Sequence, residues 1–162
     1  MHDLTPDEFE RAGLPVTADD CVFPAEPIIG TCVGCYGCWI STPGECVIDD
    51  RGKGFAALIT KHDEFIVISR LVFGGFSSPV KAVLDRSIGH MLPFFRVVKG
   101  ETHHDKRSKN KFSFRCVFYC DDMEDRDKET ATALVAANAL NLAAEGHSVE
   151  FFPSSQLFGF EL

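Results

Sequence analysis

The sequence predicts an α/β fold in three layers, a doubly wound parallel sheet with helices on both faces. From about residue 50 onward, apolar runs of strand length alternate with segments in which apolar residues recur at helical spacing. Strands that alternate with helices are joined by crossovers, so they pair in parallel and bury both faces of the sheet. With 162 residues, 45% of them hydrophobic, we expect a single domain, 1–162.

The first half of the chain contains two expected helices and one strand. Pro6 to Ala12 is a short helical segment that Gly13 ends. The pair Asp49-Asp50 is expected to cap a helix that runs to about Lys61. The run Glu64-Phe-Ile-Val-Ile-Ser69 is apolar, β-branched and aromatic, which is typical of a strand buried on both faces.

The second half continues the alternation of helices and strands. A helix capped by Ser77 or Ser78 has Pro79 in its first turn and one apolar face. Within it, Asp85 and Arg86 are expected to form an ion pair on the helix surface. The further expected segments are an extended piece at 91–98, a polar and net-basic loop with solvated histidines at 99–111, a strand at 112–119, a helix at 124–145 and a strand at 147–152.

Four of the seven cysteines lie close together in the pattern C-x2-C-x2-C-x7-C: Cys32, Cys35, Cys38 and Cys46. Thiols at a spacing of three residues point into a shared volume in a helical turn or a tight loop. A [4Fe-4S] cluster needs four thiolates, and this spacing is similar to the ferredoxin arrangement. We therefore predict a metal centre at these four residues.

Two other interpretations of the four cysteines remain open. Four thiols can hold zinc, although zinc ligands usually come as two separated C-x2-C pairs. Free cysteines are also often buried as small hydrophobic residues that bind nothing. Because the start of the chain has neither a basic nor an apolar leader segment, we expect the cytoplasm, where thiols stay reduced. A disulfide is therefore not expected.

A second candidate site follows the strand that ends at Ser69. In open α/β sheets, ligands bind in the crevice beyond the carboxyl ends of the strands. The residues delivered to that position are Ser69, Arg70, Leu71, Val72, Phe73, Gly74 and Gly75. An ordinary connection between a strand and a helix, which binds nothing, is the alternative interpretation of this loop.

Two linked motifs resemble the iron-sulfur flavoprotein branch of the flavodoxin-like NAD(P)H-dependent FMN reductases. One is the cysteine pattern with Cys46-Val-Ile-Asp-Asp50, and the other is Lys81-Ala-Val-Leu-Asp-Arg86. The resemblance covers roughly residues 30–152. It implies a flavodoxin-like fold, FMN bound at the strand ends by the loop from Ser69 to Gly75, and a [4Fe-4S] cluster on the four cysteines. It also implies electron exchange with NAD(P)H, another small redox substrate or a redox protein, and subunits paired into a homodimer or homotetramer.

The chain departs from this family in two places. Family members open with an apolar strand and a Ser/Gly/Arg loop that holds the FMN phosphate at a helix N-terminus. No such segment precedes Cys21, so we expect either that the sequence begins late or that the chain is a diverged member. In the flavin loop, Arg70 stands where the family has proline, and the aromatic residue has moved one place to Phe73. Arg70 is a hypothetical partner for the pyrimidine edge of a flavin or for a phosphate.

Charge, hydropathy and missing motifs disfavour several classes of function. The formal net charge of -8 disfavours a nucleic-acid partner. No apolar run approaches the ~18 residues that suggest a membrane span, and no Ser-His-Asp, H-E-x-x-H or P-loop motif points to a hydrolase. The sequence thus predicts an FMN-dependent NAD(P)H oxidoreductase or an electron-transfer flavoprotein. The alternative is a cofactor-free flavodoxin-like scaffold that acts as a binding or subunit-interaction module.

Overall fold

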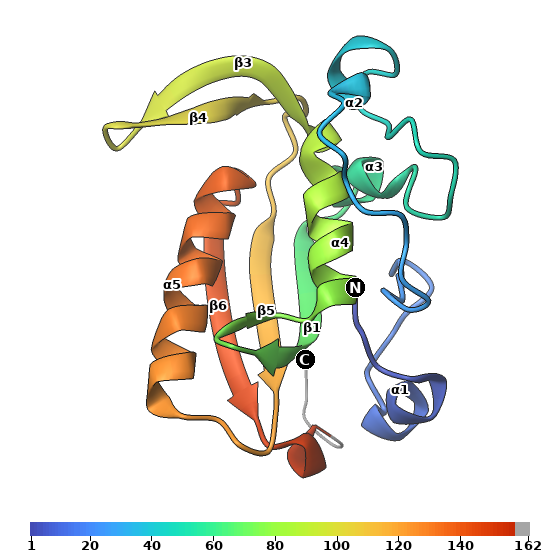
Figure 1. The fold of residues 1–162 in the computed structure, drawn as a ribbon, viewed down its shortest axis with the longest axis vertical. Coiled ribbons are helices and arrows are strands. Elements are labelled where there is room, and N and C mark those ends of the chain that lie inside the picture. The colour runs from blue at the N-terminus through green and yellow to red at the C-terminus, as the bar shows by residue number, and fades with distance from the viewer. Residues whose placement is uncertain (158–162) are drawn as a thin grey trace.

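The structure, a computed structural model, describes residues 1–157. Its central sheet has four strands in the order β2–β1–β5–β6 (Figure 1). They are β1 (Glu64–Val72), β2 (Gly75–Phe76), β5 (Ser113–Tyr119) and β6 (Gly146–Phe152). β1, β5 and β6 run parallel, whereas the short β2 folds back antiparallel on the end of β1. The predicted α/β fold with a mainly parallel sheet is therefore confirmed.

Helices cover the two faces of this sheet unequally. α3 (Phe55–Ile59), α4 (Ser78–Arg86) and α5 (Asp125–Asn141) share one core with one face of β1 and β5. On the opposite face, a smaller core joins Ile68 and Val117 to α1 (Pro6–Ala12) and to Leu157. Helices on both faces were expected, but within residues 1–157 the second face is covered by the short α1 and a few flanking residues. None of the helices in this part of the chain is long and apolar enough to cross a membrane.

A hairpin of two long strands stands off from the main sheet. β3 (Met91–Val98) and β4 (Glu101–Lys106) pair only with each other and project beyond the body of the protein (Figure 1). Their turn is Lys99-Gly100, with φ of 52° and 87°, which matches the two left-handed residues of a type I′ hairpin. β4 was predicted to be part of a loop, because its sequence is polar throughout and carries no apolar alternation. We call residues 91–106 the arm.

Two helices are shorter than the sequence predicted. The segment expected to be helical from Asp50 to Lys61 forms turns followed by α3 alone, because Asp50 binds another segment instead of capping a helix. α5 ends at Asn141, and the chain turns at Ala143, which has a φ of 58°. α1 and α4 begin and end close to the predicted residues. The remaining short helices are α2 (Gly37–Ile40), η1 (Ser87–His90) and η2 (Ser154–Gln156).

The first residues of the chain run beside the free edge of β1. The Ile68 amide donates to the Met1 carbonyl oxygen at 2.9 Å, and the Asp3 amide donates back to the Ile68 carbonyl oxygen at 3.3 Å. The Asp3 carboxylate then accepts from the Arg70 amide at 3.0 and 3.2 Å. A short stretch of parallel pairing therefore protects part of this edge, and a cavity of about 310 Å³ borders the rest.

Candidate functional site

The four clustered cysteines line a single pocket. Cys32 and Cys35 lie in an irregular loop, Cys38 lies in α2, and Cys46 follows the turn after α2. All four cysteines line one cavity of about 60 Å³. Cys32 and Cys35 are exposed, whereas Cys38 and Cys46 are half-buried, and all seven cysteines of the chain are free. The predicted grouping of these four residues is therefore found, within a loop that joins Gly30 to Val47.

The rest of the pocket wall is apolar and closely packed. Its apolar members include Tyr36, Trp39 and Val47. A Cβ atom added at Gly37 would lie 2.4 Å from the Val47 Cγ1 atom, so only glycine fits there. Trp39 covers the pocket and is held in place by its Nε1–H, which donates to the Met91 carbonyl oxygen at 3.1 Å. The cysteine loop is thus anchored to the root of the arm.

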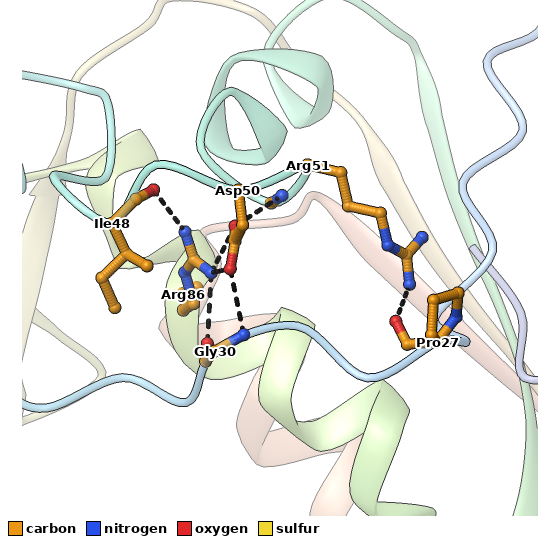
Figure 2. Close-up of polar contacts among 7 residues, drawn as sticks. Pro27, Gly30, Ile48, Asp50, Arg51 and Arg86 are labelled. Carbon is orange, nitrogen blue, oxygen red and sulfur yellow. Dashed lines mark hydrogen bonds and ion pairs between the residues drawn. The ribbon is translucent and has the colours of Figure 1, made fainter.

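An ion pair between a buried arginine and a half-buried aspartate closes the base of the cysteine loop (Figure 2). Arg86, the last residue of α4, places its Nη1 atom 2.6 and 2.7 Å from the two carboxylate oxygens of Asp50. Its guanidinium also donates to the carbonyl oxygens of Gly30 and Ile48, both at 3.1 Å. Because Gly30 precedes the cysteines and Ile48 follows them, one side chain joins the two ends of the loop.

The Asp50 carboxylate accepts hydrogen bonds from two backbone amides in addition to those from Arg86. It accepts from the Gly30 amide at 3.0 Å and from the Gly52 amide at 2.9 Å. Hydrogen bonding to Arg86 is the largest of the effects that lower the pKa of Asp50. Burial lowers the pKa of Arg86, but the hydrogen bonds to Asp50 and to the neighbouring Cys46 thiol outweigh it, so this pKa is raised. Both groups are therefore charged at neutral pH.

This pairing corrects the expectation for Arg86. An ion pair between Asp85 and Arg86 on the helix surface was predicted, but the Arg86 side chain is 0% exposed and points into the cysteine loop. Asp85 instead pairs with Lys81, one turn earlier on the exposed face of α4. Adjacent residues on a helix point about 100° apart, so Asp85 and Arg86 cannot share a face.

The Arg86 Nε atom is buried and, within residues 1–157, has no hydrogen-bond partner. Arg86 itself is one of the residues that line the cysteine pocket. An unsatisfied buried N–H costs about 1–3 kcal/mol, so such a group in a native protein calls for an explanation.

The donor set offered by the cysteine pocket is four thiols. Within the described chain, no three His, Cys, Asp or Glu side chains lie closely enough together to hold one metal ion. This finding supports neither the zinc nor the cluster interpretation of the four cysteines. A [4Fe-4S] cluster takes four thiolates, one on each iron atom. Burial, with Cys46 nearby, raises the pKa of Cys38, so its thiol is protonated until a metal or a positive charge draws off the proton.

The predicted flavin loop is a tight hairpin. Val72 pairs with Gly75, and Phe73 and Gly74 form the turn with φ of 50° and 71°. Ser69 is fully buried, and its hydroxyl donates to the Arg70 carbonyl oxygen at 3.0 Å and accepts from the Ser77 amide at the same distance. Leu71 is buried in the core. Among the seven predicted residues, the apolar side chains left at the surface are therefore those of Val72 and Phe73.

Phe73 is unusual in two respects. Its side chain is 99% exposed, and its backbone is left-handed, which favours Gly or Asn over a bulky residue. Both features cost free energy and bring no contact in return. Strained, exposed residues of this kind cluster at ligand-binding sites. The flat, apolar side chain of Phe73 is thus exposed to solvent at the hairpin tip, at the carboxyl end of β1.

The polar groups of the loop are engaged within the protein. Val72 and Phe73 are its exposed apolar side chains. The hydroxyl of Ser69 is engaged internally, and the Arg70 guanidinium lies over the Tyr119 ring, 5.4 Å from its centroid. The loop residues therefore do not form a cradle for the phosphate, and Arg70 is not aimed at a free phosphate position.

A row of aromatic rings leads from the cysteine pocket to the arm. Tyr36 stacks on Trp39 with centroids 5.4 Å apart, Trp39 contacts His104 at 4.6 Å, and His104 contacts Phe95 at 4.8 Å. The histidines are not solvated as predicted, since the His103 side chain is 8% exposed and contacts Asn141. Sequence reasoning did not find this row of rings or the Asp50–Arg86 pair. The members of each come from separate segments, so no local sequence pattern indicates them.

Two comparisons with known proteins give no match. No protein-family model matches the chain, and no curated protein matches it either.

Proposed function

We propose that the protein is an iron-sulfur electron-transfer protein of the flavodoxin-like kind, which binds a [4Fe-4S] cluster at Cys32, Cys35, Cys38 and Cys46. The observation that supports this proposal is that all four cysteines line one largely apolar pocket, together with the buried Arg86. Thiolates are the ligands that iron-sulfur clusters require, and an apolar wall limits the access of water to a cluster.

We further propose that the protein works with FMN and that NAD(P)H, another small redox molecule or a redox protein exchanges electrons with it. The exposed, strained Phe73 at the carboxyl end of β1 supports this part of the proposal. In such a protein the flavin supplies the hydride or electron chemistry, and the chain supplies position and electrostatics. Phe73 and Val72 would hold the flavin ring, while a second subunit would supply the contacts that the phosphate needs.

Anaerobic reconstitution tests the cluster. The protein is incubated with ferrous iron and sulfide, and we expect about four iron and four sulfide per chain together with a broad absorbance shoulder in the visible. Cys32→Ser and Cys46→Ser should each lose that shoulder. Cys21→Ser is the matched control, because Cys21 is exposed and lies outside the pocket. A protein that takes up neither iron nor flavin would contradict the proposal and favour the cofactor-free scaffold.

The arm is the surface that we propose for pairing with a second copy of the chain. Phe94, Phe95 and Val97 are large apolar side chains that the arm leaves exposed. Residues 96–111 contain six basic and two acidic side chains, whereas residues 121–129 contain six acidic and two basic ones, so the two segments carry opposite charges of equal size. Such complementarity favours contact between them.

These two segments cannot meet within one chain. The arm contacts the last turn of α5, where His103 Nδ1 lies 3.1 Å from Asn141 Oδ1. The acidic segment surrounds the first turn of the same helix, which is about 25 Å away because a helix rises 1.5 Å per residue. Figure 1 shows the arm and the beginning of α5 at opposite ends of the molecule. Two copies related by a two-fold axis could satisfy both contacts at once.

A further inference from the structure

We propose that the cavity beside the free edge of β1 binds a small apolar molecule that carries a positively charged amino group at one end. The cavity lies outside the cysteine loop and outside the hairpin that carries Phe73, so the inference goes beyond the proposed function and does not depend on it.

The cavity has the size and the apolar floor of a small-molecule site. Its volume of about 310 Å³ lies within the range of about 300–1,000 Å³ in which such sites fall. Phe55, Ile59, Phe65 and Ile68 line it, and each is at most 8% exposed. An apolar ring that lies on this floor is removed from water, which favours binding.

The topology of the sheet keeps this part of the edge open. Within residues 1–157, the side of β1 opposite β5 pairs with β2 at Leu71 and Val72, and with the start of the chain at Ile68. The stretch from Glu64 to Ile66 has no neighbouring strand on this side. Glu64 and Ile66 both line the cavity, which therefore occupies the place beside them where another strand would otherwise lie.

The charged groups of the lining favour a cation. Asp20 and Glu64 line the cavity and are exposed, whereas the floor is buried, so their carboxylates lie at the mouth. The Asp20 carboxylate is held in place by the Thr17 amide and hydroxyl, which both donate to Oδ2 at 2.7 Å. Burial lowers the pKa of the Met1 amino group to about 6 and that of His2 to about 4, so both basic groups are uncharged at pH 8. A ligand with its ring on the floor and its ammonium group at the mouth therefore meets negative charge.

Three probes of similar size separate the charge of the ligand from its apolar ring: phenethylamine, 2-phenylethanol and phenylacetate, which are positive, neutral and negative at pH 8. Because the two carboxylates are exposed, solvent screens them, and we expect the affinity to fall only about threefold at each step from the first probe to the last. Asp20→Asn combined with Glu64→Gln should remove this ranking. His62→Gln, which removes the remaining basic side chain of the lining, should preserve it.

Val22→Trp tests the place of binding. Val22 lines the cavity and is 40% exposed, so a larger side chain can fill the cavity from its mouth without entering the buried core. We expect the affinity for all three probes to fall about tenfold or more. Ile28→Trp is the matched control, because Ile28 is an exposed apolar residue of the same segment that does not line the cavity. Its affinities should equal those of the unaltered protein.

The measurement is a titration of the isotope-labelled, full-length protein with each probe, followed by two-dimensional NMR. Saturable shifts of the Phe23 and Ile66 amide signals, with phenethylamine bound most tightly and binding weakened in Val22→Trp, support the inference. Equal affinities for the three probes, shifts spread over the exposed apolar surface or shifts that do not saturate overturn it. Shifts confined to the hairpin that carries Phe73 overturn it as well, because they would locate the probes at the proposed flavin site.

Discussion

The buried Arg86 and the half-buried Asp50 form an ion pair, with Nη1 at 2.6 and 2.7 Å from the two carboxylate oxygens, although 36 residues separate them in the chain. The same guanidinium holds the carbonyl oxygens of Gly30 and Ile48, which flank the cysteine loop. The shape of the pocket therefore depends on a residue of α4, which lies outside the loop.

Removing the Asp50 carboxylate should destabilise the fold. In Asp50→Ala, the buried guanidinium loses its counter-charge and the Gly30 and Gly52 amides lose their acceptor. We expect the free energy of unfolding to fall by about 3 kcal/mol, measured by urea unfolding with an unchanged slope. Asp49→Ala is the control, because Asp49 is exposed and its pair with Lys53 is screened by solvent. Equal losses of unfolding free energy in Asp50→Ala and Asp49→Ala would contradict a structural role for the Asp50–Arg86 pair.

Phe73→Gly should raise the stability of the fold and weaken the binding of flavin. Glycine adopts the left-handed turn without strain, and the fully exposed ring makes no packing contact to lose, so we expect a gain of about 1 kcal/mol. At the same time the affinity for FMN, measured by quenching of flavin fluorescence, should fall about tenfold. Lys99→Gly relieves the same kind of strain at the tip of the arm and should leave FMN affinity unchanged. Unaltered FMN binding in Phe73→Gly would remove Phe73 from the proposed flavin site.

The stability of the protein should fall as the pH is lowered through the range in which His2 titrates. His2 is 5% exposed and stacks on Phe9, and burial lowers its pKa to about 4. Between the unfolded pKa of about 6.5 and the folded value, the unfolded chain binds a proton that the folded chain does not bind. The contribution of His2 to stability is therefore fully present above about pH 6.5 and decreases below it, by about 3 kcal/mol for the full shift. Burial also lowers the pKa of the Met1 amino group, to about 6, so that group adds a loss of stability between about pH 8 and pH 6. Buried His90, whose pKa is also lowered by burial, contributes in the same direction.

Urea unfolding at pH 7 and at pH 4.5 measures this effect. His2→Phe keeps an aromatic ring on Phe9 and should show a smaller loss of stability between the two pH values than the unaltered protein. His147→Gln, which changes an exposed histidine, should show the full loss. If His2→Phe loses as much stability between pH 7 and pH 4.5 as His147→Gln does, the pH dependence does not come from His2.

The arm should decide the oligomeric state. Phe95→Ser combined with Val97→Ser removes exposed apolar surface from the arm and should shift the protein toward the monomer in sedimentation experiments. Val16→Ser, an exposed apolar position elsewhere, should leave the distribution unchanged. Because the proposed contact is also ionic, high salt should weaken the dimer.

Charge exchange gives a sharper test of the same contact. Lys99→Glu with Lys109→Glu, or Asp122→Lys with Asp125→Lys, should each weaken association. All four changes in one chain should restore association, because the two segments would again be complementary. A monomer at every concentration, or a dimer that ignores these changes, would exclude the arm as the interface.

Local patterns were enough to predict the central part of the fold. β1 and β5 lie in the middle of the sheet and each has a mainly apolar, buried central run, so they are recognisable without knowledge of their neighbours. β4 was missed because its six residues are polar and pair only with β3, a contact that the arm forms outside the core. The helix expected after Asp50 was overestimated because a carboxylate suited to capping binds Arg86 instead.

The α/β class and the grouping of the four cysteines could be predicted from the sequence alone, because strand periodicity and close spacing act over a few residues. Three features required the folded structure: Arg86 lines the cysteine pocket, Ser69 is engaged internally and Phe73 is exposed at a hairpin tip. Each of these depends on which distant segment packs against the residue. A side chain's partner across tens of residues is set by the packing of the whole chain, and no local pattern encodes it.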